Sequence, residues 1–509
     1  MARKKPEQGD EAGQEMIGLA EAAGVLKVSR STLTRMLSQG RIRGFKVGRQ
    51  WRFRRGDLDK LSRMAHPSAA AVNIPDVEAA LKKLPPVPSG KGFEILDPPQ
   101  GEYPNTEEEK ALDRLFRALV HGAIAAGASD IHIDRTGDAS VMRFRIDGVL
   151  HEVARLPWAY AAHRALVACC RYYAEISVDE WLVNHLSLFR VRKGDRNYHV
   201  RVATMASMYG PIVVMRILAG EYEIPDLERI GMMAGDRERY LRALRAPTGL
   251  VLVTGPTGSG KTTILYAGLG QIGSPEIKMY TIEDPIEMAL PGMTQIPVNR
   301  RGGMTFDRIL RALMVHDPDV IMVGCDRFQW GTADSLAVAE GCMQAAITGH
   351  LVATTLHAYS AADAICRMLE IGVKPLMLAE SLICVVSSRL ARRVCSQCGE
   401  PDQPPFDLLS QIAERARAGG FALPDQPKFM RGKGCDHCRG TGYRGRIGLF
   451  EVMALDHDLY RLIAERSPVK AIQEAAIKKG MTTLVADGLR KAAAGITSLA
   501  EAARVTTEW

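Results

Sequence analysis

The sequence predicts a multidomain α/β protein organised around a buried parallel sheet. Its 509 residues exceed what one hydrophobic core supports, so about three or four domains are expected. A glycine-rich segment follows one apolar run and precedes a helical pattern, which places it at the carboxyl end of a strand. Short apolar runs of the kind buried in parallel sheets occur at 250–254, 278–282, 320–323 and 351–356.

Composition excludes a membrane-embedded protein. No stretch approaches the roughly 20 consecutive apolar residues that a membrane span requires, and residues 1–14 lack an apolar signal core. We therefore expect a cytoplasmic protein, which partners could dock peripherally on the inner membrane.

The positive charge of the chain is concentrated at its N-terminal end. Residues 1–63 hold 15 Lys/Arg and seven Asp/Glu, which gives this segment a net charge of +8. The other residues hold 51 charges of each sign and are neutral together. A local positive field of this kind suits a polyanion such as DNA.

Residues 16–64 have the pattern of a small separate domain. Ser29 is a suitable N-cap residue for its second helix, and Gly40 ends that helix. Gly48 and Arg49 interrupt an alternating segment, as in a pair of short strands. The predicted elements are helices over 18–26, 30–38 and 57–64 and two strands within 42–53.

A linker and an α+β domain are predicted next. Residues 65–105 are rich in Pro, Ala, Ser and Gly, which predicts a partly extended linker. Residues 106–222 begin with an amphipathic helix over 108–126 and continue with alternating strand patterns. The strands are expected over 129–133, 140–149, 198–203 and 212–218.

The glycine-rich segment fits the phosphate-loop pattern G-x-x-x-x-G-K-[ST]. Its backbone N–H groups and the following helix N-terminus would surround phosphate oxygens. Lys261 would reach the β- and γ-phosphates, and the Thr262 hydroxyl would ligate Mg²⁺, which predicts ATP with Mg²⁺ as the ligand. The predicted nucleotide-binding residues are Gly255, Pro256, Thr257, Gly258, Ser259, Gly260, Lys261, Thr262 and Thr263.

Three further segments carry residues suited to phosphoryl transfer. Residues 281–287 place Glu283 and two other carboxylates just beyond a buried strand, on the side where phosphates would lie. Residues 317–324 form a second strand entered from an acidic turn. Residues 348–357 hold His350 and His357, which could contact the γ-phosphate or transmit its loss. A lone histidine at such a place is more often a hydrogen-bonded core residue.

Ten cysteines divide into two groups. Four of them form two C-x-x-C pairs separated by 36 residues, a pattern that presents four thiolates to tetrahedral Zn²⁺. The alternative is a reduced, metal-free loop. The predicted zinc ligands are Cys395, Cys398, Cys435 and Cys438, and the cysteines expected to be small buried residues are Cys169, Cys170, Cys325, Cys342, Cys366 and Cys384.

These motifs, in this order, resemble those of the assembly ATPases of type II secretion and type IV pili over roughly residues 106–509. The resemblance implies a hexamer that hydrolyses ATP and drives pilin or pseudopilin assembly through an inner-membrane platform protein. It also implies that Arg201 and Arg216 reach a nucleotide as arginine fingers, although both could be solvated strand residues. The implied parts are a RecA-like P-loop NTPase core over 223–390, a zinc-binding subdomain over 391–452 and a helical region over 453–509.

One departure from this family concerns hydrolysis. The Walker B glutamate that the family uses as the catalytic residue is replaced by Cys325. A thiol is a poor water-activating base beside phosphate, because nearby negative charge raises its pKa. Glu283 or Asp326 is then the candidate carboxylate for orienting water. The alternative is a non-hydrolysing structural subunit of a mixed ring.

Residues 18–63 resemble an excisionase-type helix-turn-helix, related to the winged MerR-like domains. The resemblance implies that a recognition helix enters the DNA major groove and that a wing contacts phosphates. The same small domain could instead bind a protein partner. A second hypothesis is therefore a DNA-binding regulator whose ATPase core is a nucleotide-dependent oligomerisation switch. The implied DNA-contacting residues are Arg30, Ser31, Thr34, Arg35, Arg49 and Arg52.

Overall fold

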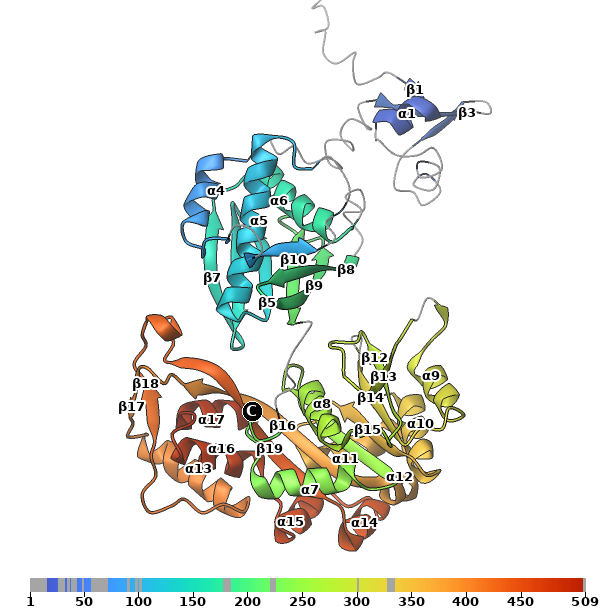
Figure 1. The fold of residues 1–509 in the computed structure, drawn as a ribbon, viewed down its shortest axis with the longest axis vertical. Coiled ribbons are helices and arrows are strands. Elements are labelled where there is room, and N and C mark those ends of the chain that lie inside the picture. The colour runs from blue at the N-terminus through green and yellow to red at the C-terminus, as the bar shows by residue number, and fades with distance from the viewer. Residues whose placement is uncertain are drawn as a thin grey trace, which may run out of the picture. The chain divides into compact units, whose positions relative to one another are not determined.

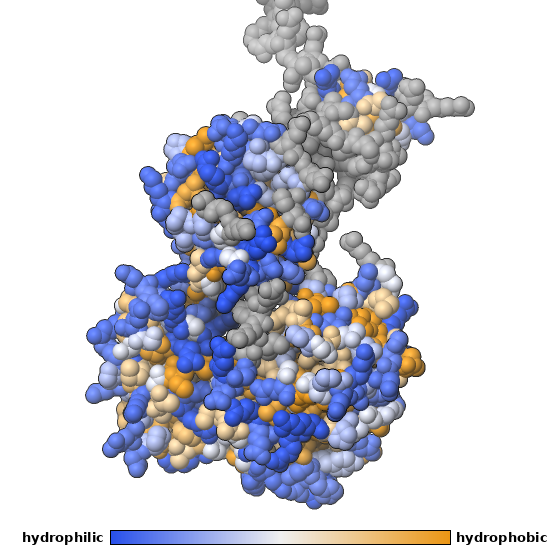
Figure 2. Space-filling model, in the orientation of Figure 1, coloured by the Kyte–Doolittle hydropathy of each residue, from blue (hydrophilic) through white to orange (hydrophobic). Residues whose placement is uncertain are grey.

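The computed structural model divides the chain into two compact units, Met1–Gly220 and Glu221–Trp509. Within the described ranges, no helix combines the length and apolarity needed to cross a membrane. Hydrophilic and hydrophobic residues are interspersed on the face of the second unit shown in Figure 2. The structure describes residues 16–25, 33, 37, 44–47, 50–55, 72–88, 92–96, 99, 103–176, 185–219, 226–299, 302–326 and 335–506.

The N-terminal domain contains a three-stranded antiparallel sheet with the strand order β1-β3-β2. A strand that the sequence did not predict occupies Met16–Gly18, so the first helix begins at Leu19 rather than at residue 18. Ile17, Leu33 and Phe53 belong to its core cluster. The helix expected over 57–64, and most of that over 30–38, lie outside the described residues. The elements are β1 (Met16–Gly18), α1 (Leu19–Val25), β2 (Phe45–Val47) and β3 (Gln50–Arg54).

The larger domain of the first unit is a seven-stranded antiparallel sheet, ordered β4-β8-β9-β10-β5-β6-β7, with helices packed on it (Figure 1). Its longest helix, α5, begins at a capping box in which Thr106 accepts from the Glu109 N–H. The helix ends at Gly127, whose φ of 68° suits glycine. The elements are α4 (Ile74–Leu81), β4 (Glu94–Leu96), α5 (Glu107–Ala126), β5 (Asp130–Thr136), β6 (Ala139–Ile146), β7 (Val149–Leu156), α6 (Tyr160–Tyr173), β8 (His185–Lys193), β9 (Arg196–Met205) and β10 (Ile212–Ala219).

The prediction of a linker over 65–105 was wrong for much of that segment. Helix α4 buries Val77 and Ala80 in the core of the larger domain, and β4 pairs with β8. The proline-rich composition was misleading, because Pro75 lies in the first turn of α4, where proline is well tolerated. Residues 72–88 and 92–96 therefore belong to the fold of the larger domain.

The second unit is built on a seven-stranded sheet ordered β13-β12-β14-β15-β11-β16-β19, parallel except for β19. All four strands predicted from apolar runs are present in it, and every residue of β11 and β15 is buried. The elements of this layer are α7 (Ala234–Leu244), β11 (Gly249–Thr254), α8 (Lys261–Ile272), β12 (Met279–Asp284), β13 (Met293–Pro297), α9 (Phe306–Leu313), β14 (Val320–Asp326), α10 (Leu336–Ile347), β15 (Leu351–Leu356), α11 (Ala361–Ile371), α12 (Pro375–Ser381), β16 (Leu382–Val394) and β19 (Tyr443–Ala454).

The C-terminal part continues from this sheet instead of forming a detached domain. The predicted boundary after residue 390 falls inside β16, and the one after residue 452 falls inside β19. These two long strands pair in antiparallel fashion, so the cysteine pairs lie at the end of an arm of the core sheet. The remaining elements are β17 (Gly399–Pro401), α13 (Phe406–Ala418), β18 (Met430–Gly432), the 3₁₀ turn η4 (Asp436–Cys438), α14 (His457–Ala464), α15 (Val469–Lys478), α16 (Leu484–Ala493) and α17 (Leu499–Thr506).

The placement of α4 in the core is testable with one substitution. Val77→Asp should lower the free energy of unfolding of the first unit by about 3 kcal/mol or more, because it buries an unpaired carboxylate. Thermal denaturation and limited proteolysis of the full chain would measure the loss. Ala79→Asp, at an exposed position of the same helix, is the matched control and should be nearly neutral. If both substitutions lower the free energy of unfolding by the same small amount, residues 74–81 behave as the linker that the sequence predicts.

Candidate nucleotide and metal sites

The phosphate loop lies between the buried strand β11 and the first turn of α8. Gly255, Gly258 and Gly260 have φ values of 146°, 78° and 94°, which side chains other than glycine rarely permit. At Gly255 a Cβ atom would approach Ser259 Oγ to 2.5 Å and Ser388 O to 2.6 Å. The loop can therefore close this tightly only with glycine, and its backbone fits the curved cradle that phosphates require.

Lys261 is held inside this loop. Its side chain is 95% buried, and its Nζ donates to Gly255 O at 2.7 Å and Pro256 O at 3.0 Å. Ser388 of β16 holds the loop in place through a hydrogen bond, because its Oγ donates to Ser259 Oγ at 3.3 Å. Thr262 is half-buried and Thr263 is exposed at the start of α8. The predicted phosphate and magnesium ligands thus lie together at one end of β11.

Glu283 lies at the carboxyl end of β12 in a hydrogen-bonded network. Its side chain accepts from Thr281 Oγ1 at 2.5 Å, from Gln295 Nε2 at 2.9 Å and from the Tyr266 hydroxyl. Burial raises the pKa of Tyr266, and the adjacent Glu283 charge raises it further, so the hydroxyl stays a proton donor. Donors among the described residues therefore use three of a carboxylate's roughly four acceptor positions and leave one on Oε2.

Sequence reasoning missed three of these supporting residues. Tyr266 comes from α8, Gln295 from β13 and Ser388 from β16, so each reaches the site from a different element. Tyr266 lies five residues after Lys261, and that spacing alone does not indicate contact with a strand. Only the sheet order, which places β13 beside β12, brings Gln295 to Glu283.

The Walker B segment runs along β14 next to Glu283. The register pairs Ile282 with Val323 and Asp284 with Asp326. At Gly324 a Cβ atom would lie 3.1 Å from Glu283 Cγ, so glycine leaves room for the carboxylate. Cys325 and Asp326 belong to β14, but their side chains lie outside what the structure describes. The backbone therefore brings both candidate carboxylate positions to the same edge of the sheet.

The two histidines lie at opposite edges of the sheet. His350 precedes β15, and its carbonyl oxygen accepts from Gly249 N at 3.1 Å, at the amino end of β11. The six residues of β15 span about 20 Å, which separates His350 from the phosphate loop. His357 follows β15 at the loop edge, where Thr254 Oγ1 donates to Ala358 O at 3.3 Å. His350 therefore lies at the opposite end of β15 from the phosphate loop of its own chain, and its role in contacting the γ-phosphate or transmitting its loss stays a prediction.

Arg201 and Arg216 are direct cross-strand neighbours on β9 and β10 of the first unit. Arg216 Nε donates to Asp130 Oδ1 at 2.8 Å. Burial alone would raise the pKa of Asp130, but the hydrogen bond and charge of Arg216 lower it below its ordinary value. The pair concentrates two guanidinium groups on one face of the sheet, which suits an anionic partner.

The four predicted zinc ligands gather at the end of the β16–β19 arm. Their Sγ atoms all lie within 4.8 Å of one another. The separations are 3.9 Å for Cys395–Cys435 and 3.7 Å for Cys398–Cys438 and Cys435–Cys438. Tetrahedral Zn²⁺ with Zn–S bonds of about 2.3 Å requires S–S edges of about 3.8 Å, so the cluster fits the ion.

Backbone groups favour the thiolate form of one member of this cluster, Cys438. Cys435 N and Gly442 N approach Cys438 Sγ to 3.1 Å and 3.2 Å. Burial raises the pKa of Cys438, but these N–H groups and the neighbouring cysteines outweigh it and lower the pKa to about 6. Of the cysteines predicted to be buried, Cys366 is half-buried, Cys325 lies outside the described side chains, and Cys169, Cys170, Cys342 and Cys384 are buried.

The N-terminal hairpin carries cations above aromatic rings. Lys46 Nζ lies 6.0 Å from the Trp51 ring centroid, and the Arg54 guanidinium lies 5.1 Å from that of Phe45. Arg52 is half-buried on β3. The other residues predicted to contact DNA, which are Arg30, Ser31, Thr34, Arg35 and Arg49, lie outside the described residues.

Together, the phosphate loop and the parallel sheet define a P-loop nucleotide-binding protein. The family model "Type II/IV secretion system protein" matches residues 105–504, and a helix-turn-helix domain model matches residues 16–63. The chain therefore belongs to the type II/IV secretion family and carries an additional helix-turn-helix domain at its N-terminus. Membership makes it a nucleotide-binding ATPase that uses Mg²⁺.

Individual relatives agree with this assignment. The type II secretion system ATPase E of Vibrio cholerae is 38% identical over 404 residues, covering 79% of this chain and 77% of the relative. The type IV pilus assembly ATPase PilB of Pseudomonas aeruginosa is 36% identical over 454 residues, covering 89% and 75%. The solved structure of the Legionella pneumophila ATPase DotB shares the fold, with a TM-score of 0.56, 18% identity and coverage of 80% and 97%.

The cysteine cluster predicts one zinc ion per chain. Cys395→Ser should release it and destabilise the end of the β16–β19 arm, because three remaining thiolates hold the ion less tightly. Elemental mass spectrometry of the purified full chain measures the stoichiometry. Cys366→Ser, outside the cluster, is the control and should keep the zinc. Wild-type protein with a zinc-to-protein ratio near zero would contradict the assignment.

Proposed function

We propose that this ATPase is a hexameric motor that hydrolyses ATP on an inner-membrane platform protein to drive type II secretion or the assembly of a pilus-like fibre. The observation that carries the proposal is the tightly closed phosphate loop with buried Lys261, beside the hydrogen-bonded Glu283. Relatives that bear the names of secretion and pilus-assembly ATPases cover most of the chain and support it. The zinc-bound arm and the N-terminal domain would serve docking or regulation.

Nucleotide binding begins at the phosphate loop. Its backbone N–H groups would donate hydrogen bonds to the β- and γ-phosphates, and the positive partial charge at the amino end of α8 would attract them. Lys261 would exchange its bonds to Gly255 O and Pro256 O for phosphate oxygens. Thr262 would hold Mg²⁺, which neutralises developing charge on the phosphates. These residues account for binding without any contribution from position 325.

Hydrolysis requires a water molecule oriented toward the γ-phosphate. We assign this role to Glu283, because it lies at the loop edge of the sheet and is fixed by three donors. Among the described residues, one acceptor position on Oε2 stays open for water. Asp326 is the alternative carboxylate, since its backbone pairs with Asp284 at the same edge. His357 follows β15 at that edge and could sense the loss of the γ-phosphate.

Arg201 and Arg216 would complete the site in an assembled ring. Each would stabilise charge on the nucleotide as an arginine finger, a role for which guanidinium geometry is suited. Asp130 restrains Arg216 in the first unit through its 2.8 Å bond, so the arginine is positioned before any nucleotide arrives. This role requires a hexamer or a comparable assembly.

The proposal predicts the outcome of a steady-state ATPase assay on the assembled protein. Lys261→Ala should lower turnover at least about 100-fold, because it removes the cation that neutralises the β- and γ-phosphates. Cys325→Glu should raise turnover about tenfold or more, since it restores a water-activating carboxylate. Unchanged turnover in Lys261→Ala would refute the motor, and wild-type turnover at background would favour a non-hydrolysing subunit.

A DNA-binding regulator is the second candidate function. The helix-turn-helix match at residues 16–63 and the excess of eight positive charges in residues 1–63 favour it. In this case nucleotide-dependent oligomerisation would change DNA occupancy. The two functions are compatible in one chain, and a protein partner for the small domain is the remaining alternative.

DNA binding through phosphate contacts would show in the salt dependence of affinity. The affinity of the full chain for a short duplex should fall steeply as salt rises, and Arg52→Ala should weaken binding and reduce the slope by about one. Fluorescence anisotropy measures both quantities. Lys470→Ala, an exposed lysine of the second unit, is the control. A flat salt response would argue against phosphate contacts.

A further inference from the structure

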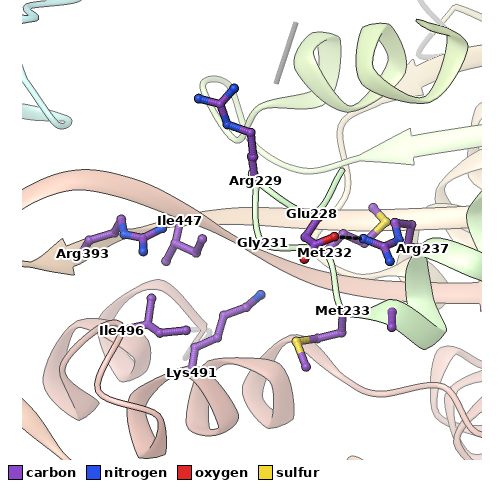
Figure 3. Close-up of a pocket in the computed structure, with 11 residues that line it drawn as sticks. Glu228, Arg229, Gly231, Met232, Met233, Arg237, Arg393, Ile447, Lys491 and Ile496 are labelled. Atoms are coloured by element: carbon purple, nitrogen blue, oxygen red, sulfur yellow. Dashed lines mark hydrogen bonds and ion pairs between the residues drawn. The ribbon is translucent and has the colours of Figure 1, made fainter. Parts of the chain in front are cut away.

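A cavity of about 590 Å³ in the second unit has no role in the proposed hydrolysis. It lies between the segment that enters this unit, the ends of β16 and β19, and the α16–α17 corner (Figure 3). Its volume is in the range of pockets that hold small organic molecules. The residues that line it are Glu228, Arg229, Gly231, Met232, Met233, Ala234, Arg237, Arg393, Ile447, Lys491 and Ile496.

The entering segment is fixed as one wall of this cavity. Gly448 N donates to Ile230 O at 2.8 Å, so the segment pairs with the edge of β19. Gly231 has a φ of 97°, and a Cβ atom there would lie 2.6 Å from Ile447 Cδ1. Glycine therefore lets the segment pack against β19, and the wall is a defined surface of the fold.

The lining is strongly cationic. Four basic residues face one carboxylate, a formal balance of 4 − 1 = +3 for the described lining. Glu228 pairs with Arg237 at 2.7 Å. Lys491 is 98% buried and bonds Asp487 Oδ2 at 2.5 Å and Gly448 O at 2.6 Å. Even after these pairs, Arg393 has no carboxylate partner within the described lining.

The rest of the lining is apolar. Met232 and Met233 come from the entering segment, Ile447 from β19 and Ile496 from the turn before α17. Figure 3 shows Lys491 and Ile496 on the opposite side of the two strands from Arg229, with Arg393 on the strand beside Ile447. A ligand for this cavity must therefore combine negative charge with an apolar body.

We propose that this cavity binds a small organic phosphate, whose anionic group contacts Arg393 and whose apolar part packs on Ile447, Ile496 and the two methionines. Guanidinium groups match phosphate oxygens in two-pronged hydrogen bonds, which favours phosphate over a single carboxylate. A bound molecule would bridge the entering segment to β16 and α16. The phosphate ester would belong to a separate effector, because the far end of a nucleotide held on the phosphate loop is its uncharged base.

The test uses a fluorescent methylanthraniloyl derivative of AMP, titrated into the full chain and followed by anisotropy. Arg393→Glu should weaken binding at least about tenfold, because it reverses an exposed charge that the phosphate contacts. Arg415→Glu, an exposed arginine on α13, is the matched control and should change affinity less than about twofold. Circular dichroism establishes that both variants are folded.

A Lys261→Ala variant separates the cavity from the phosphate loop. Binding that survives Lys261→Ala but fails in Arg393→Glu supports the proposal. Binding that is lost in Lys261→Ala places the probe on the phosphate loop and overturns the proposal. Equal binding by wild type and Arg393→Glu, or no binding up to millimolar probe, overturns the proposal. The probe lacks the β- and γ-phosphates, so failure of the probe to bind does not test ATP binding at the phosphate loop. The ATPase assay of Lys261→Ala tests the motor function separately.

Discussion

The parallel register of β11, β12, β14 and β15 is the constraint on which the nucleotide site depends. Gly249 pairs with Leu351 and Met279 with Val320, so these strands end at a common edge. Carboxyl ends of parallel strands are where α/β proteins bind ligands. Because every residue of β11 and β15 is buried, a shift of register would expose apolar side chains and is energetically excluded.

Three hydrogen bonds hold the carboxylate of Glu283 in a fixed position at this common edge. The carboxylate joins β12 to α8 through Tyr266 and to β13 through Gln295. A buried carboxylate is stable only when donors satisfy it, so the three protein donors that hold Glu283 also limit its movement. The same network couples the helix that carries Lys261 to the strand that carries the proposed water-orienting group. In the proposed mechanism this network therefore links ATP binding mechanically to hydrolysis.

Much of this site could be predicted because its motifs are local in sequence. The phosphate loop, the four strands and the cysteine pairs each depend on spacing within a few residues. Residues 72–96 were assigned to a linker because the sequence shows the prolines but not the surface that Val77 and Ile95 bury. His350 and His357 were predicted from one motif, but the strand between them places them at opposite ends of β15. Tyr266 and Gln295 depend on sheet order, which no local pattern contains.

The claim that Glu283 supplies the carboxylate for hydrolysis is tested most directly by Glu283→Gln, with ATP affinity and turnover measured on the same assembled sample. The substitution keeps the size of the side chain and an acceptor for Tyr266 but removes the negative charge. The account predicts ATP affinity within a few-fold of wild type and turnover reduced at least about 100-fold. Full ATPase activity in Glu283→Gln would contradict it and transfer the role to Asp326 or another group.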